Sequence, residues 1–157
     1  MKRFVTFGVL VALAGCGPAS QTEGDAGVKS TPLAGTVNGQ PWTAASATAS
    51  AHKAFGDGGE KWLDVGSTAF TCSTFIPDAQ LIGVVPWQVG TYPLSLSRNL
   101  TLVTRSTDGG STMNNVAISG RVEILSAPDA GVATMRIRAT ANSQNTVEGQ
   151  LDVQVCD

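Results

Sequence analysis

The chain has 157 residues and a formal net charge of −2, with ten Lys and Arg against twelve Asp and Glu. So few basic residues form no positive patch, which excludes nucleic acid as a partner and charge-driven binding to anionic lipid. The chain has one histidine, three cysteines and no glycine-rich nucleotide motif, so the usual metal-site and nucleotide-site patterns are absent and we expect no cofactor.

The N-terminus has the order of a secretory signal peptide. A short basic segment, Met1–Arg3, precedes an apolar stretch from Phe4 to Leu13. A transmembrane helix needs about 20 apolar residues, so this stretch is too short to span a membrane. It ends in the motif Leu-Ala-Gly-Cys at positions 13–16, which resembles the lipobox of bacterial lipoproteins.

The lipobox resemblance implies a processed and lipid-anchored protein. In that family a diacylglyceryl group joins the cysteine sulfur and a peptidase cuts before it, so residues 1–15 would be the signal peptide and Cys16 the lipidated N-terminus. Two or more acyl chains hold a protein stably on a membrane. Gly17 stands where Asp would resemble the inner-membrane retention signal, so the resemblance favours the outer membrane of a cell envelope. The alternative is a plain secretory signal with a chance cysteine.

Residues 16–31 predict a flexible tether after the lipidated cysteine. Val28 is the only sizeable apolar side chain in this segment, so burial cannot offset the entropy lost on ordering it. Residues 32–157 are enough for one domain with a single core.

The domain is predicted to be all-β, as a single antiparallel sandwich or small barrel of about 8–10 strands. Asn38-Gly39 predicts a type I′ hairpin turn, because both central residues of that turn need positive φ. Ala44–Ala54 has the alanine content of a helix, but its interleaved Ser and Thr favour a strand. Strands are expected at Leu33–Val37, Trp42–Ala51, Ala69–Ile76, Gln80–Val85, Asn99–Arg105, Asn115–Ser119, Val122–Ile124, Val132–Thr140 and Gly149–Val155.

The outward charges of the last strands predict cross-strand ion pairs. If these strands pair in chain order, Arg136 and Arg138 lie between Glu123 on one side and Glu148 and Asp152 on the other. Such pairs contribute about 0.2–1 kcal/mol each.

With Cys16 committed to lipid, Cys72 and Cys156 remain to form a disulfide in an oxidising compartment. Leu151, Val153 and Val155 alternate, so strict alternation points Cys156 outward. We therefore expect the bridge at a strand end or on the sheet exterior. Two cysteines without a histidine partner make a poor metal site.

Two classes of function stay open. One is a non-catalytic envelope protein that is structural or binds a partner or a small ligand. The other is a lipid-anchored hydrolase that uses His52 with a serine and a carboxylate. His52 has no Gly-x-Ser-x-Gly elbow around it, which favours the non-catalytic class.

Three aromatic residues are candidates for a ligand surface. Trp62, Trp87 and Tyr92 lie near predicted turns, and aromatic side chains often line carbohydrate or peptide sites. The alternative is that they fill the core, as we expect for Trp42, because the domain has few large side chains.

Three segments together resemble a loose set of uncharacterised β-rich bacterial lipoproteins. Such a domain opens with an Asn-Gly-x-x-Trp hairpin and closes with a glycine-containing strand that ends in cysteine. The segments here are Gly35–Trp42, Val89–Leu94 and Val147–Cys156. The resemblance implies fold and location only, and it carries over no catalytic residue.

Overall fold

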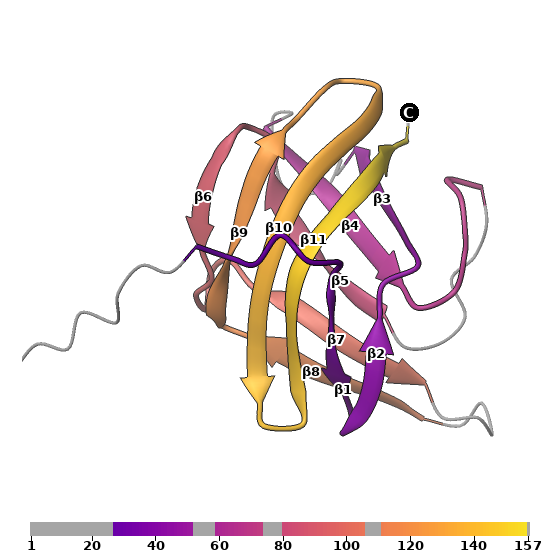
Figure 1. Ribbon diagram of the computed structural model, residues 1–157, viewed down its shortest axis with the longest axis vertical. Helices are drawn as coiled ribbons and strands as arrows, with labels where there is room; N and C mark the ends of the chain where they lie inside the picture. Colours follow the sequence, from indigo (N-terminus) through magenta and orange to yellow (C-terminus); the bar gives the residue numbers. More distant parts are fainter. Residues whose placement is uncertain (1–26, 52–58, 74–79, 106–110, 157) are drawn as a thin grey trace, which may run out of the picture.

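A computed structural model describes residues 27–51, 59–73, 80–105 and 111–156, and these form an all-β domain (Figure 1). The described residues contain eleven strands: β1 (Ala34–Val37), β2 (Gln40–Thr43), β3 (Ser46–Ala51), β4 (Glu60–Gly66), β5 (Gln80–Pro86), β6 (Gly90–Pro93), β7 (Leu100–Arg105), β8 (Thr112–Ala117), β9 (Ser119–Ser126), β10 (Gly131–Asn142) and β11 (Asn145–Val155).

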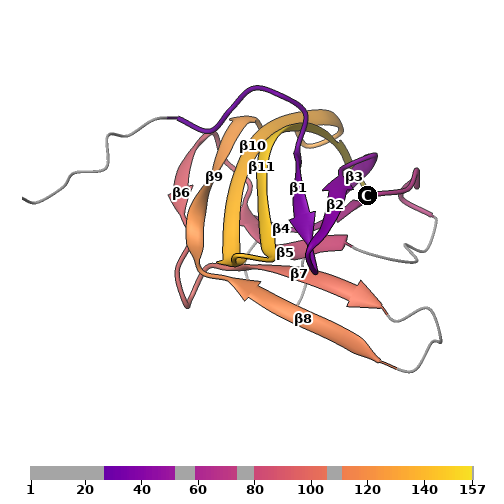
Figure 2. The same ribbon diagram turned by 60° about the horizontal axis from the view of Figure 1, so that its bottom comes forward.

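Nine strands form one curled sheet in the order β6-β9-β10-β11-β3-β4-β5-β7-β8, and β1 joins it by pairing with β11 and β2. β11 and β3 pair in parallel, whereas the other strand pairs are antiparallel. β8 continues into β9 through the single residue Ile118, so the sheet curls back toward its own start (Figure 2). The all-β prediction is confirmed, but the sheet is an open half-barrel with more strands than expected.

The curl buries one shared core. Alternation along the strands points one set of apolar residues into the concave side, where burial of such a side chain contributes about 1.5–3 kcal/mol. Strands from both ends of the sheet order contribute side chains to this core. The largest side chains that are less than 2% exposed are Leu33, Leu63, Val65, Leu81, Val85, Leu100, Leu102, Val122, Ile124, Met135, Ile137 and Val147.

The predicted hairpin and the Ala-rich strand are confirmed. Asn38 and Gly39 have φ values of 52° and 72°, as a type I′ turn requires, and they join β1 to β2. Within the Ala-rich stretch, Ser46–Ala51 form β3 and pair with β4, whereas residues 52–54 lie outside the described part. The expected strand Trp42–Ala51 is interrupted between β2 and β3.

One strand was placed wrongly, and two were missed. The expected strand Ala69–Ile76 is wrong for residues 69–73, which form no strand and end in a turn at residues 72 and 73, and residues 74–76 lie outside the described part. Phe70 is nevertheless buried, and its backbone N–H donates to Ser46 Oγ at 3.1 Å. The burial of Phe70 and this hydrogen bond therefore hold the loop, instead of strand pairing. β4 and β6 were not expected as strands.

The last three strands pair in chain order, and the predicted ion pairs form. Arg138 lies opposite Glu148 with an Nη2–Oε1 distance of 2.6 Å. Arg136 lies opposite Glu123, with Nη1 3.9 Å from Oε2. Asp152 instead accepts a hydrogen bond from Thr134 Oγ1.

Residues 27–33, here called the N-terminal strap, cross the outer face of β9, β10 and β11 (Figure 1). The Val28 N–H donates to Glu123 Oε1 at 3.1 Å, and the Val28 side chain is only 4% exposed. The Leu33 N–H donates to the carbonyl oxygen of Gln150 at 2.9 Å. Residues 27–31, which the sequence assigned to the tether, therefore lie on the domain.

Glu148 anchors the strap by charge. Lys29 donates to Glu148 from both its backbone N–H and its ammonium, each at 3.3 Å. Partial burial acts to raise the pKa of Glu148, but hydrogen bonds from Arg138 and Lys29 together lower that pKa below its ordinary value. The carboxylate is thus held in its charged form under the strap.

Gly149 lets the strap approach β11. Its φ is +148°, and a Cβ there would lie 2.6 Å from both Leu33 Cα and the carbonyl oxygen of Thr31. No side chain fits this crossing unless the strap moves away.

We expect Gly149→Ala to destabilise the domain more than Gly131→Ala. Gly131 also has positive φ, at +93°, but open space surrounds its Cβ position, so its substitution adds only backbone strain of about 1–2 kcal/mol. Gly149→Ala adds the clash with the strap, which we expect to cost about 1–3 kcal/mol more. Urea unfolding measures both losses, and hydrogen exchange over residues 27–33 reports the strap. Equal losses with an unchanged strap would contradict this role of Gly149.

The predicted disulfide between Cys72 and Cys156 is present. It joins the turn after β4 to the residue that follows β11, with a Cα–Cα distance of 5.5 Å. Cys156 is 9% exposed, and its N–H donates to the carbonyl oxygen of Ala49 at 2.7 Å, whereas Cys72 is exposed. The bridge thus lies at a strand end, which was one of its two expected places.

Removing the bridge by Cys72→Ala with Cys156→Ala should lower the free energy of unfolding by about 4 kcal/mol, because it frees a link across 84 residues in the unfolded chain. Denaturant titration of the wild type and the double variant measures this loss. Two alkylatable thiols in the natively folded protein, isolated without reductant, would contradict the bridge.

Candidate functional site

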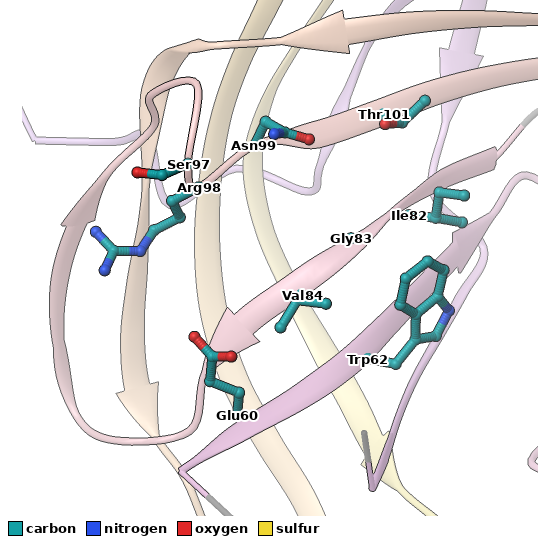
Figure 3. Close-up of a pocket in the computed structure, with 9 residues that line it drawn as sticks. All are labelled: Glu60, Trp62, Ile82, Gly83, Val84, Ser97, Arg98, Asn99 and Thr101. Carbon is teal, nitrogen blue, oxygen red and sulfur yellow. The ribbon is translucent and has the colours of Figure 1, made fainter. Parts of the chain in front are cut away.

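The outer face of β4, β5 and β7 carries an open groove of about 500 Å³ (Figure 3). Strand register builds it, because Trp62 pairs with Val84, and Ile82 pairs with Thr101. Their neighbours Leu63 and Leu81 point into the core, so the groove residues point outward. The groove is lined by Glu60, Trp62, Ile82, Gly83, Val84, Ser97, Arg98, Asn99 and Thr101.

Trp62 is fixed in place within the groove. Its side chain donates a hydrogen bond to Asp64, two residues along the same outward face of β4. Burial raises the pKa of Asp64, and the hydrogen bond from Trp62 opposes that rise. Figure 3 shows the indole standing beside Ile82 and Val84. Because its N–H is already engaged, Trp62 offers a ligand its ring instead of a hydrogen bond.

The loop between β6 and β7 forms the polar wall of the groove. The Ser95 N–H donates to the carbonyl oxygen of Arg98 at 2.6 Å, and Asn99 Nδ2 donates to the carbonyl oxygen of Leu96 at 3.0 Å. These bonds close the loop on itself. Asn99 and Thr101 both line the groove, and their amide oxygen and hydroxyl can accept hydrogen bonds.

Gly83 brings that wall close to the sheet. A Cβ at this position would lie 2.7 Å from Leu100 Cδ2 and 2.8 Å from the carbonyl oxygen of Asn99. The missing side chain therefore allows the start of β7 to pack tightly against β5.

Glu60 and Arg98 bring opposite charges to one end of the groove (Figure 3). Within the described residues, neither side chain has an ion-pair partner, although the Arg98 guanidinium lies 5.5 Å from the centre of the Tyr92 ring. Among the residues that the structure describes, the groove thus offers a carboxylate acceptor and guanidinium donors without an ion-pair partner, and the charges of these two side chains cancel.

The three aromatic residues that the sequence suggested as a ligand surface lie at different places in the structure. Trp62 lines the groove, whereas Trp87 and Tyr92 pack against the core. Trp87 Nε1 donates to the carbonyl oxygen of Pro128 at 2.9 Å, and the Tyr92 hydroxyl donates to the carbonyl oxygen of Gln88 at 3.0 Å. Trp42 is buried in the core, as expected.

The other groove residues were missed in the sequence. Ile82 and Val84 lie in an expected strand, Gln80–Val85, but only the register with β4 shows that they face outward beside Trp62. One local pattern could have indicated the groove: Trp62 and Asp64 are two residues apart, so on a strand they point to the same face.

Cys16 and His52 lie outside the residues that the structure describes. The hydrolase hypothesis, which depends on His52, therefore stays a prediction. Among the described residues, no group of three or more His, Cys, Asp or Glu side chains is placed to hold a metal ion. No helix in the same residues is long and apolar enough to cross a membrane.

Comparison of the chain with protein-family models, with curated proteins and with solved structures finds no match. The resemblance to β-rich bacterial lipoproteins stays a prediction.

Proposed function

We propose that this chain is a non-catalytic, lipid-anchored protein of the cell envelope, placed at the outer membrane, that binds a neutral carbohydrate in the Trp62 groove. The observation that carries the binding role is the indole of Trp62, which Asp64 fixes on the outer face of the sheet between aliphatic and polar side chains. A pre-positioned apolar surface with a few polar groups beside it is the usual composition of a ligand site.

The chemistry of the groove fits a sugar ring. One face of a pyranose is lined by C–H groups, which pack against the flat indole and the side chains of Ile82 and Val84. Each sugar hydroxyl both donates and accepts hydrogen bonds, as hydroxyl groups do. It can therefore serve the carboxylate of Glu60 as a donor and the guanidinium of Arg98 as an acceptor.

The charges in the groove argue for a neutral ligand. An anionic sugar would meet the carboxylate of Glu60, and a cationic one would meet the guanidinium of Arg98, since both lie at the same end. Like charges at close range oppose binding. A neutral sugar ring is repelled by neither charge and can hydrogen-bond to both the carboxylate and the guanidinium.

The anchor is supported by the lipobox motif at positions 13–16. Gly27, where the strap begins, is eleven positions after Cys16. An extended chain spans at most about 3.3–3.6 Å per residue, so the domain would lie within about 40 Å of the bilayer. Such a position suits a protein that holds an envelope glycan close to the membrane.

Binding should be tested with an array of neutral and charged oligosaccharides, probed with the full chain in detergent. We expect neutral sugars to bind and Trp62→Ala to weaken binding about tenfold, since contacts of aromatic rings contribute about 0.5–1.5 kcal/mol. Asp64→Asn keeps an acceptor for the indole and should bind almost as the wild type does, whereas Asp64→Ala should bind less well.

The Asp64→Asn variant is the control for the fold of this face. An array with no neutral ligand, or binding that is unchanged in Trp62→Ala, would refute the carbohydrate site.

Lipidation should be tested separately by metabolic labelling with a fatty-acid analogue. The wild type should be labelled and fractionate with membranes, and Cys16→Ser should lose the label because it has no acceptor sulfur. Labelling that survives this substitution would show that the lipobox interpretation is wrong.

A further inference from the structure

The outer face of the sheet carries a second exposed apolar surface directly beside the groove. Val116 of β8 is 48% exposed, and Ile118, which follows β8, is 44% exposed. We call these two side chains the β8 platform. The described lining of the groove ends at Thr101 on β7, one strand short of the platform. Adjacent exposed apolar side chains beside a pocket are typical of an interaction site.

Strand register places the platform on the same face as the groove. Ile82 of β5 pairs with Thr101 of β7, and Thr101 pairs in turn with Val116 of β8. Directly paired residues point to the same face of a sheet, with Cβ atoms about 4.5–5.5 Å apart. Since Ile82 and Thr101 line the groove, Val116 continues it on the outer face without a gap.

Ile118 reaches this face in the same way. Leu100 and Ala117 pair with each other and are fully buried, so the next residue in each direction away from that pair points away from the core. These two residues are Asn99, which lines the groove, and Ile118. The platform therefore lies beside the row that Asn99 and Thr101 form.

The contact between β8 and β10 lies on the opposite face. Asn142 Nδ2 donates to Asn115 Oδ1 at 3.4 Å. Asn115 pairs with Leu102, which is fully buried in the core, so the Asn115 side chain points inward. Val116 is its neighbour and points outward, so this contact with β10 does not cover the platform.

We infer that the ligand of the groove is an extended chain of neutral sugar rings, three of which lie on this face, with the third ring on the β8 platform. This inference rests on the proposed carbohydrate site and adds a subsite to it. β4, β5, β7 and β8 are consecutive in the sheet. Neighbouring strands are about 4.8 Å apart, so β4 and β8 lie about 14 Å apart across the face. An extended chain of three sugar rings covers such a distance.

The chemistry of the surface alternates along that distance. The first ring packs on the indole of Trp62. Asn99 and Thr101 lie on the far side of the groove from Trp62 and offer hydrogen bonds to the hydroxyls of the second ring (Figure 3). The platform then offers a second apolar contact, for the C–H groups of the third ring.

The position of the platform on a sheet face favours a sugar over a peptide strand. A peptide that extends a sheet adds at an edge, through backbone hydrogen bonds. β7 and β8 pair with each other from Leu100↔Ala117 to Arg105↔Thr112, and a ligand on their outer face meets side chains instead of free backbone groups. The C–H face of a sugar ring supplies the flat apolar surface that such side chains can contact.

Calorimetric titration of the full chain tests this inference, in a detergent that has no sugar head group. The probes are linear oligomers of glucose, mannose, galactose and N-acetylglucosamine, each prepared with one to five rings. For a series that binds, we expect the dissociation constant to fall up to three rings and to change little beyond. Val116→Thr with Ile118→Thr keeps both side chains β-branched but removes apolar surface. This double variant should raise the dissociation constant of the three-ring probe about fivefold and leave that of the two-ring probe unchanged.

Val132→Thr is the matched control, because Val132 is an exposed valine on β10, outside the groove, and its substitution should change no affinity. A three-ring probe that binds no more tightly than a two-ring probe would overturn the inference. A dependence on chain length that survives the double variant would overturn it too, since the platform would then contact something other than the sugar. In both cases a loss of binding in Trp62→Ala would still support the carbohydrate site. No binding by any series would refute that site and this subsite together.

Discussion

The fold depends on the pairing of β11 with strands on both of its sides. β11 pairs with β10 along nearly its whole length and with β1 at residues 146–148, but it pairs with β3 only at Gln154↔Thr48 and Val155↔Ala49. In the order of the sheet, that short parallel contact joins the half that contains β9 and β10 to the half that contains β4, β5 and β7. The disulfide of Cys156 lies directly beside it, so the covalent bond reinforces the narrowest junction of the sheet.

This arrangement separates the tasks of the two halves. The half with β9, β10 and β11 binds the strap through hydrogen bonds and one ion pair, and thus faces the proposed anchor. The other half carries the Trp62 groove on its outer face. Neither site uses a residue of the other, so we expect that a ligand in the groove would leave the strap contacts intact. The core between them is continuous, which keeps the two surfaces in a fixed relation.

Much of the fold could be predicted because the pattern of β10 and β11 is local. Regular alternation placed their residues on the correct faces, and the charges of Arg136 and Arg138 then predicted their partners. β4 was missed because Trp62 is apolar but points outward, which obscures the alternation of apolar and polar residues along this strand. The groove was missed because it needs the register of three strands that are distant in sequence. The strap was missed because hydrogen bonds to Glu123 and Glu148 hold it, and its composition does not reveal them.

The strap also determines how the domain would respond to mechanical load. A pull on a lipidated N-terminus would reach Gly27 first and act across β9, β10 and β11, not along any of them. The hydrogen bonds of Val28 and Lys29 would then break one after another before the force reached β1. β1 is paired with both β2 and β11, so it would resist the force better than the strap does. The strap contacts would therefore break first and protect the core from unfolding.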